Sequence, residues 1–160
     1  TVSDPLTDLR LMMGVPWSFM DELFDDKAPL MREQFSRGAD ISAFQHSPFI
    51  LIKRGNRSRS IVDQYFSRNH FKPKLVLETE NTVTTLAMAQ AGMGITICPE
   101  LFLRAQPTSS PSAGEVDVFP LTDPSTISKM VAGYRQDRYL PHYAERFIEI
   151  TRQALTGMTI

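Results

Sequence analysis

The sequence contains a single cysteine, Cys98, and no long run of apolar residues. One cysteine forms neither an internal disulfide nor a multi-cysteine metal site, and Cys98 lies in an apolar segment typical of a buried thiol. A membrane-spanning helix needs about 20 consecutive apolar residues, and no segment approaches that length. The first ten residues, TVSDPLTDLR, lack the basic start and apolar core of a signal peptide. These absences favour a cytoplasmic protein without a membrane partner.

Neither sign of charge is in excess. The chain of 160 residues has 17 Lys and Arg and 18 Asp and Glu residues, which gives a formal net charge of -1. A domain that binds nucleic acid by itself normally carries a basic excess or a basic face. The balance therefore argues against a free-standing nucleic-acid-binding domain.

Common catalytic and cofactor-binding motifs are absent as well. The sequence contains no Gly-x-Ser-x-Gly, no P-loop, no His-Glu-x-x-His and no Gly-x-Gly-x-x-Gly. The three histidines, His46, His70 and His142, are far apart in the sequence, and each lies in a predicted loop or at the end of a predicted element. We therefore expect no catalytic residue, no metal site and no cofactor, and we do not expect an enzyme.

Three apolar strand patterns alternate with two helix patterns between residues 49 and 99. Residues 49–52 form an unbroken apolar run, which is typical of a strand covered on both faces. Asn56 or Ser58 can cap the first helix, Asn81 can cap the second, and Gly92 can end it. Strands separated by short helices predict a parallel sheet with right-handed crossovers. The residues expected to be buried in these strands are Ile50, Ile52, Leu75, Leu77, Ile95 and Ile97.

Further elements are predicted on both sides of this unit. A short strand is expected at residues 11–15, and one or two helices, broken near Pro29, are expected to follow. Residues 104–115 are rich in Pro, Ser and Gly and indicate a loop or linker. Two more strands are expected at residues 116–121 and 127–135. The chain closes with a helix over 141–155, whose apolar stripe is Ala144, Phe147, Ile148, Thr151 and Leu155.

Polar and basic side chains follow the first two strands of the predicted sheet. Ligands of open parallel sheets bind outside the carboxyl ends of the strands, where helix N-termini present backbone N–H groups to anions. Arg59 would add further positive charge. The alternative is that Asn56 and Asn81 only cap their helices and that the basic side chains are solvated. The candidate ligand-binding residues are Lys53, Arg54, Gly55, Asn56, Arg57, Ser58, Asn81, Thr82 and Thr84.

Four segments in order give the chain a family resemblance. They are ISAFQHSPFILIKRGNRSRSIVDQYF, KPKLVLETENTVTTLAMAQAGMGITICPE, VFPL and AGYRQDRYLPHYAERFIEITRQAL. Over residues 41–155 the set resembles the effector-binding domain of LysR-type transcriptional regulators, and residues 11–40 match more weakly. The resemblance implies an α/β fold like that of type 2 periplasmic binding proteins, which consists of two lobes with an effector cleft between them.

The resemblance also implies a domain organisation. Residues 1–10 would be a remnant of lobe I, residues 11–112 would be a complete βαβαβ lobe II, and residues 113–160 would return to lobe I. The family's winged helix-turn-helix domain and the first half of lobe I are missing from the chain, which implies a truncated chain or a fragment. DNA would then be contacted only through a domain that is missing from this chain.

A ligand-sensing and oligomerisation module of a LysR-type regulator is therefore the expected function. Its expected partners are a small, anionic effector and further copies of the chain. The rival interpretation is a solute-binding protein or an enzyme on the same two-lobe fold, because fold alone does not determine function. The apolar stripe of residues 144–155 lacks most of its expected lobe I partners. We therefore expect the chain to self-associate near this helix and the strand before it.

Overall fold

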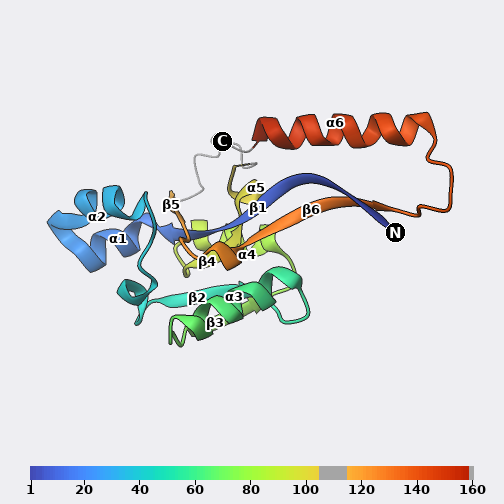
Figure 1. Ribbon diagram of the computed structural model, residues 1–160. Coiled ribbons are helices and arrows are strands. Elements are labelled where there is room, and N and C mark those ends of the chain that lie inside the picture. The colour runs from blue at the N-terminus through green and yellow to red at the C-terminus, as the bar shows by residue number, and fades with distance from the viewer. Residues whose placement is uncertain (105–114, 159–160) are drawn as a thin grey trace. The chain divides into compact units, whose positions relative to one another are not determined.

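A computed structural model describes residues 1–104 and 115–158 (Figure 1). It divides the chain into two compact units, Thr1–Leu9 with Ile127–Ile160 and Arg10–Thr126. The linker predicted at residues 104–115 lies almost entirely outside the described residues. The larger unit contains the whole predicted strand–helix alternation, so it is described first.

The first strand of the chain is the centre of an antiparallel sheet in the larger unit. Strand β1, Val2–Pro16, pairs with β4, Thr96–Pro99, and with β5, Val116–Pro120. Met13 lies opposite both Ile97 and Phe119 in these pairings. The strand predicted at residues 11–15 is therefore confirmed as part of a longer strand. Its buried apolar side chains Leu11, Met13 and Val15 alternate along one face, and Gly14 and Pro16 between and after them are buried as well.

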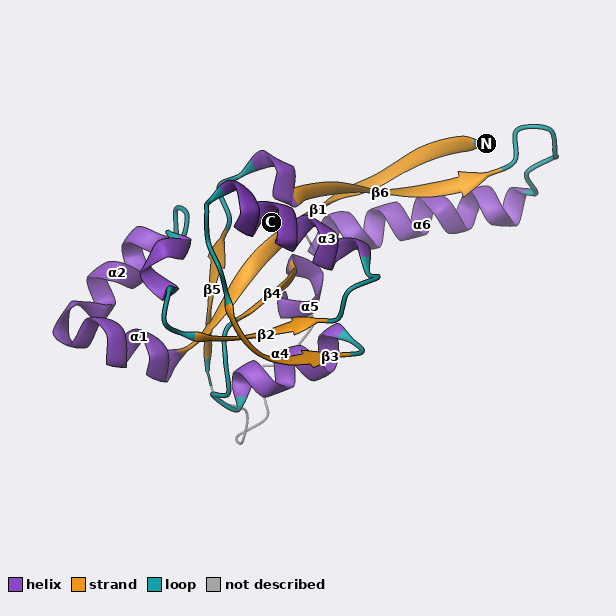
Figure 2. Cartoon of the chain, turned by 90° about the horizontal axis from the view of Figure 1, so that it is seen from below, coloured by secondary structure: helices purple, strands orange, loops and turns teal. Residues whose placement is uncertain are grey.

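The predicted parallel pair forms a second, smaller sheet. Strand β2, Pro48–Ile52, pairs in parallel with β3, Lys74–Thr79. A short parallel bridge joins β2 to Ile95, whose N–H donates to the Pro48 carbonyl at 2.8 Å and whose carbonyl accepts from Ile50 N–H at 2.8 Å. Helix α3, Arg57–Arg68, and helix α4, Thr82–Gln90, connect these strands in the predicted order (Figure 2).

The predicted burial of the parallel strands is only partly correct. Ile50, Ile95 and Ile97 are buried and Ile52 is half-buried. The prediction for β3 is wrong, because Leu75 and Leu77 are 36% and 38% exposed. Within the described residues β3 pairs with β2 alone and is an edge strand, and β4 runs antiparallel to its main partner β1.

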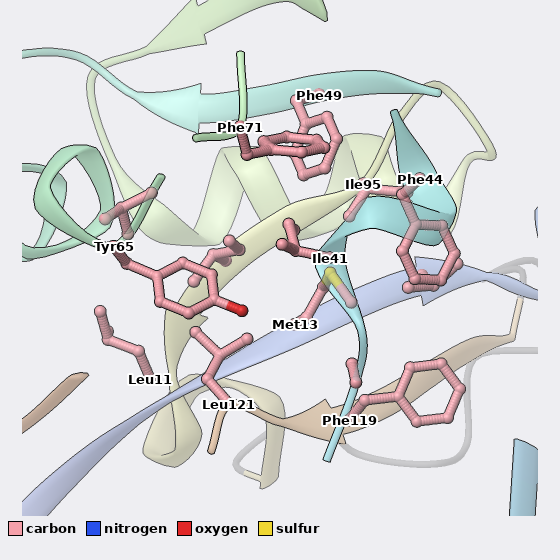
Figure 3. Packing of buried hydrophobic residues seen from close by; sticks show 14 of the residues in the cluster. Leu11, Met13, Ile41, Phe44, Phe49, Tyr65, Phe71, Ile95, Phe119 and Leu121 are labelled. Carbon is pink, nitrogen blue, oxygen red and sulfur yellow. The ribbon is translucent and has the colours of Figure 1, made fainter. Parts of the chain in front are cut away.

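Aromatic side chains from several elements hold the larger unit together (Figure 3). The Phe49 ring contacts those of Phe66 and Phe71 at centroid separations of 5.7 Å and 5.6 Å, so β2 is fixed against α3 and the turn after it. Phe35 contacts Phe119 at 5.5 Å and links the N-terminal helices to β5. Aromatic pairs at such distances add about 0.5–1.5 kcal/mol beyond their buried area.

Two short helices precede β2. The sequence predicted either one or two helices here, and the structure has two. Helix α1 spans Trp17–Phe24 and α2 spans Ala28–Phe35, separated by the 3-10 turn Asp25–Lys27. Pro29 lies in the first turn of α2 rather than breaking a longer helix, since its missing N–H costs nothing there. Short segments complete the unit: the 3-10 turns Ile41–Phe44 and Pro124–Thr126, and helix α5, Glu100–Arg104.

The two glycines after α4 have different structural reasons. Gly92 adopts a φ of 78°, the left-handed conformation that ends many helices and that residues with a side chain rarely adopt. Gly94 is needed for space, because a Cβ there would lie 2.9 Å from the Ile50 side chain and 3.0 Å from the Pro48 carbonyl oxygen. The absence of a side chain thus lets the chain approach β2 and form the bridge at Ile95.

The smaller unit contains a strand pair and a helix. Strand β6, Ile127–Tyr134, pairs with β1, and helix α6, His142–Met158, lies alongside them. Arg152 fixes the helix by donating to the Pro5 carbonyl at 3.2 Å and by an ion pair with Asp4 at 3.0 Å. Of the predicted apolar stripe, Ala144, Ile148 and Leu155 are half-buried, whereas Phe147 is 70% exposed.

The compact units divide the chain at Ile127, whereas the predicted return to lobe I began at residue 113. The difference lies in β5, which hydrogen-bonds along residues 12–16 of β1 and so belongs to the larger unit. The lobe boundaries themselves refer to a complete two-lobe domain and stay a prediction.

Candidate functional site

The carboxyl ends of β2 and β3 meet at one edge of the larger unit. Ile52 lies opposite Thr79 in the parallel register, and the Lys53 N–H donates to the Thr79 carbonyl at 2.9 Å. The side chain of Lys53 also forms an ion pair with Glu80. The loops that follow the two strands are therefore neighbours, as the sequence predicted, and we call this region the β2–β3 edge.

Both helices that start at the β2–β3 edge carry the predicted caps. The Asn56 side chain accepts a hydrogen bond from the Ser58 N–H at 2.8 Å, and that of Asn81 accepts from the Thr84 N–H at 2.9 Å. Such caps satisfy one of the four N–H groups that a helix start leaves without an intrahelical partner. Gly55 precedes the first cap with a φ of 100° and turns the chain into α3.

A buried pair of hydroxyl groups holds the loop between β3 and α4 from the inside of the protein. The Thr79 and Thr85 hydroxyl oxygens lie 2.5 Å apart, so one hydroxyl can donate to the other. Each oxygen also lies 3.0 Å from the Asn81 carbonyl oxygen, which can accept from either hydroxyl. Both residues are buried. The pair is not apparent from the sequence, since Thr79 lies in a strand and Thr85 in a helix and only the fold brings them together. The pair holds Asn81 in its capping position without facing solvent itself.

Arg59 is the most buried basic residue of this region, with 4% of its side chain exposed. Its guanidinium donates to the Ile52 carbonyl at 2.8 Å, to Asp63 at 2.8 Å and to Glu78 at 2.5 Å. Burial acts to lower the pKa of Arg59, but the hydrogen bonds to Asp63 and Glu78 outweigh it and raise the pKa above its ordinary value. Arg59 thus ties α3 to the ends of β2 and β3 and is already neutralised.

The remaining basic side chains of the β2–β3 edge differ in their partners. Lys53 is paired with Glu80, and Arg54 lies 3.7 Å from Asp63. Arg57 is exposed, and it has no ion-pair partner within residues 1–104 and 115–158. Arg57 is therefore the basic side chain best able to attract an anion at this edge.

A surface hollow of about 740 Å³ lies beside the start of α3. Arg54, Gly55, Asn56 and Arg57 line it, together with Arg59 and Ser60. The remaining lining residues lie further along α3 and were not predicted: Asp63, Gln64 and Ser67. Asn81, Thr82 and Thr84 do not line this hollow and lie at the start of α4 instead. The structure thus brings the two predicted segments together at the strand ends but places the hollow on the α3 side.

The predicted site residues are accessible. Lys53, Arg54, Gly55, Asn56, Arg57, Asn81 and Thr84 are exposed, and Ser58 and Thr82 are half-buried. Their assignment to a ligand site stays a prediction. In the described part of the chain, no three His, Cys, Asp or Glu residues are grouped so as to hold a metal ion. Within the same residues, no helix is both long and apolar enough to cross a membrane.

Several solved structures have a similar fold, and two of them were solved with a small molecule bound. The effector-binding domain of QuiR in complex with shikimate matches 99% of this chain and 67% of its own, with a TM-score of 0.64 and 16% identity. The regulatory domain of CcmR from Synechocystis PCC6803, in complex with 2-PG, matches 98% of this chain and 68% of its own, with a TM-score of 0.72 and 16% identity. HinK from Pseudomonas aeruginosa, a LysR family regulator, matches 99% of this chain and 49% of its own, with a TM-score of 0.69 and 16% identity.

Curated relatives are similar over shorter stretches. The uncharacterized HTH-type transcriptional regulator YybE of Bacillus subtilis (strain 168) is 38% identical over 53 residues, which are 33% of this chain and 18% of YybE. The transcriptional activator protein LysR of Escherichia coli (strain K12) is 32% identical over 54 residues, 34% of this chain and 17% of that protein. These matches thus span less than a fifth of either regulator.

The family model described as the LysR substrate binding domain matches residues 26–156, which is more than half of the chain. The matched region includes the β2–β3 edge, both capped helices and most of α6. The fold is the mixed α/β fold of these domains, which is like that of type 2 periplasmic binding proteins. The chain therefore belongs to the LysR substrate binding domain family.

Proposed function

We propose that this chain is the effector-sensing module of a LysR-type transcriptional regulator and that a small anion binds at the β2–β3 edge. The observation that carries the proposal is the hydrogen bond from Lys53 N–H to the Thr79 carbonyl, because it holds two helix N-termini side by side. The proposal is supported by the family and by its solved members, of which QuiR was solved with shikimate and CcmR with 2-PG.

The chemistry of the β2–β3 edge favours an anion over a cation. Helix N-termini carry a partial positive charge and present backbone N–H groups, which stabilise a nearby anion. Thr82 and Thr84 add hydroxyl groups at the start of α4, and Arg57 adds a full charge at the start of α3. A carboxylate that reached both helix starts would replace water at several donors at once.

The effector would act by changing which arrangement of two lobes predominates. A ligand shifts such an equilibrium only if it binds one arrangement better than the other, and tight but equal binding shifts nothing. The described residues include neither a complete second lobe nor a DNA-binding domain, and both are part of what we propose for the regulator. DNA would be contacted through those domains alone, and this chain would carry the signal.

Self-association is a second part of the proposal and rests on the exposed apolar side chains of α6. Tyr143, Phe147 and Ile150 are 78%, 70% and 50% exposed. Large apolar side chains grouped on one exposed helix usually mark a contact surface. We propose a second copy of the chain as the partner.

A solute-binding protein or an enzyme on the same fold is the rival function. The matched family and the curated relatives favour a regulator, because YybE and LysR are both described as transcriptional regulators. We propose that this chain catalyses no reaction.

A ligand screen tests the proposed function. Small carboxylates and matched neutral amides would be screened by thermal shift against a complete two-lobe domain that includes this chain. We expect at least one carboxylate to raise the melting temperature, with the amide of the same skeleton inactive, because binding only to the folded state stabilises it. A screen in which amides and carboxylates act equally would contradict an anionic effector, and chemical turnover of a ligand would favour the enzyme.

A further inference from the structure

A second hollow, of about 390 Å³, lies at the other end of α3. It is formed by the loop after α2, the last turn of α3 and the loop between β5 and the turn Pro124–Thr126. Since α3 has 12 residues and rises about 1.5 Å per residue, this hollow is roughly 18 Å from the helix start at the β2–β3 edge. All of its walls belong to the larger compact unit.

Two carboxylates line this hollow, and each is held in place by a cap. One Asp40 oxygen accepts from the Ser42 N–H at 3.0 Å and from the Ser42 hydroxyl at 2.7 Å. One Asp123 oxygen accepts from the Ser125 N–H at 2.9 Å and the Ser125 hydroxyl at 2.6 Å. These hydrogen bonds to Ser125 are the main reason that the pKa of Asp123 is lowered, with help from Arg68. The Asp123 carboxylate is therefore charged at neutral pH, and each carboxylate keeps a second oxygen outside its cap.

Tyr65 is the third polar group of the hollow and the one that indicates a ligand. Only 4% of the residue is exposed, and its hydroxyl makes no hydrogen bond within the described residues. Its ring packs in the aromatic core (Figure 3), and the Tyr65 residue lines the hollow. Burial, followed by the charges of Asp123 and Asp40, raises the pKa of Tyr65 to about 12. The hydroxyl has no protein partner among the described residues and is not sealed inside the core, so it is available to a molecule in the hollow.

The surroundings of the hollow favour a positive charge. The last turn of α3 contributes the negative end of the helix dipole, and the lining contains no basic side chain. Arg68 lies outside, half exposed, with a long contact of 3.4 Å to Asp123. Gly38 lets the wall close, because a Cβ there would meet the Thr122 methyl at 2.1 Å. A side chain at position 38 would therefore displace Thr122 from the wall of the hollow.

An organic cation suits this hollow better than a metal ion. Metal ions of the hard class prefer several carboxylates in direct contact, and the described residues offer no group of three His, Cys, Asp or Glu side chains. The volume falls within the range of small-molecule pockets. We propose that the hollow binds a small organic ammonium ion, whose N–H groups donate to Asp40, Asp123 and the Tyr65 hydroxyl oxygen. This proposal is independent of the anion site at the β2–β3 edge.

Nuclear magnetic resonance titration of the 160-residue chain with n-butylammonium chloride tests the proposal. We expect saturable shifts of the amide signals of residues 39–42, 65–69, 122–123 and 125–126, and none with sodium butyrate or sodium chloride at equal ionic strength. Tyr65→Phe keeps the buried ring and removes only the hydroxyl, and Asp40→Asn removes one charge. Each should weaken binding at least fivefold, the scale of a lost hydrogen bond to a charged group.

Asp137→Asn is the matched control, because Asp137 is an exposed carboxylate paired with Arg135 outside the hollow. It should leave the affinity for n-butylammonium unchanged. Circular dichroism would establish that each variant is folded, and Tyr65→Phe remains informative if Asp40→Asn is not. Absence of saturable shifts in the millimolar range, equal shifts with sodium chloride, or tighter binding of magnesium chloride would each overturn the proposal.

Discussion

Single residues at the β2–β3 edge divide into those whose side chains hold the edge together and those whose side chains remain exposed. Arg59 is buried and shared between Asp63, Glu78 and a backbone carbonyl, so its charge is already used. Arg57, two positions earlier, is exposed. From the sequence both were basic residues of one loop and helix start, and only the fold separates them. The caps at Asn56 and Asn81 were predictable, because a cap depends on residues within three positions of it.

Replacing Thr82 by Val tests the predicted effector site at the residue scale. The substitution removes a half-buried hydroxyl at the start of α4 and keeps the shape of the side chain. We expect effector binding to the complete two-lobe domain to weaken by about 1–2 kcal/mol, the scale of one lost buried hydrogen bond. Isothermal titration calorimetry would measure it.

Val83→Thr is the matched control for this substitution, because Val83 is the next residue of the same helix and is 54% exposed. It should leave the affinity unchanged. If Thr82→Val and Asn81→Ala both bind the effector as tightly as the parent, these residues do not belong to the site.

Among the elements, strands that read alike in the sequence have different positions in the sheets. The sequence patterns of β2, β3 and β4 all predicted buried strands, yet β3 exposes its apolar side chains. Periodicity reports which residues alternate, but an edge position depends on which strands pair. That pairing is set by contacts far apart in the sequence, such as Met13 with Ile97. The element types were therefore predictable and the burial of β3 was not.

A pair of alanine substitutions distinguishes the interior strand from the edge strand. Ile97 in β4 is 4% exposed and Leu75 in β3 is 36% exposed. We expect Ile97→Ala to lower the free energy of unfolding by about 2–5 kcal/mol, because it opens a cavity in the core. Leu75→Ala should cost about 1 kcal/mol or less, since the neighbouring water fills the space. Urea denaturation followed by circular dichroism measures both, and equal losses would contradict the edge position of β3.

Helix α6 tests the proposed self-association. Phe147 is 70% exposed on this helix, so a charge there should disrupt a contact between copies without disturbing the helix. We expect the parent chain to associate at tens of micromolar in sedimentation equilibrium and Phe147→Glu to be monomeric. Gln153→Glu adds the same charge at another exposed position of α6 and should still associate. A monomeric parent chain with Phe147 protected from solvent would show that the helix has an internal partner instead.

On the scale of the whole molecule, the chain leaves and re-enters the smaller unit. Residues 1–9 and 127–160 form that unit, and residues 10–126 form the other. The return to lobe I predicted at residue 113 refers to a complete two-lobe domain and stays a prediction, and the sequence of β5 carries no signal of which strand it joins. Its partner is β1, more than 100 residues earlier in the sequence. Long-range pairing of this kind is the part of the fold that local patterns do not encode.

Hydrogen exchange along β1 tests this division, since the strand contributes to both units. Its residues 11–16 are buried or half-buried between β4 and β5, while residues 2–10 are half-buried or exposed. We expect the amides of residues 11–15 to exchange more slowly than the non-proline amides of residues 2–9, because protection follows burial and the cooperativity of the surrounding unit. Mass spectrometry of peptides from the two segments would measure the rates. Equal protection along the strand would mean that the units open together.

The lack of room for a side chain at Gly94 limits how this position can vary among related proteins. Alanine, the smallest replacement, would place a carbon 3.0 Å from the Pro48 carbonyl oxygen, which is backbone and has little freedom to move away. The substitution would destabilise the bridge between the two sheets, and it would not act on a ligand directly. Glycine should therefore persist at this position in regulators that respond to quite different effectors, whereas Met93 beside it, which is 51% exposed, should be free to change.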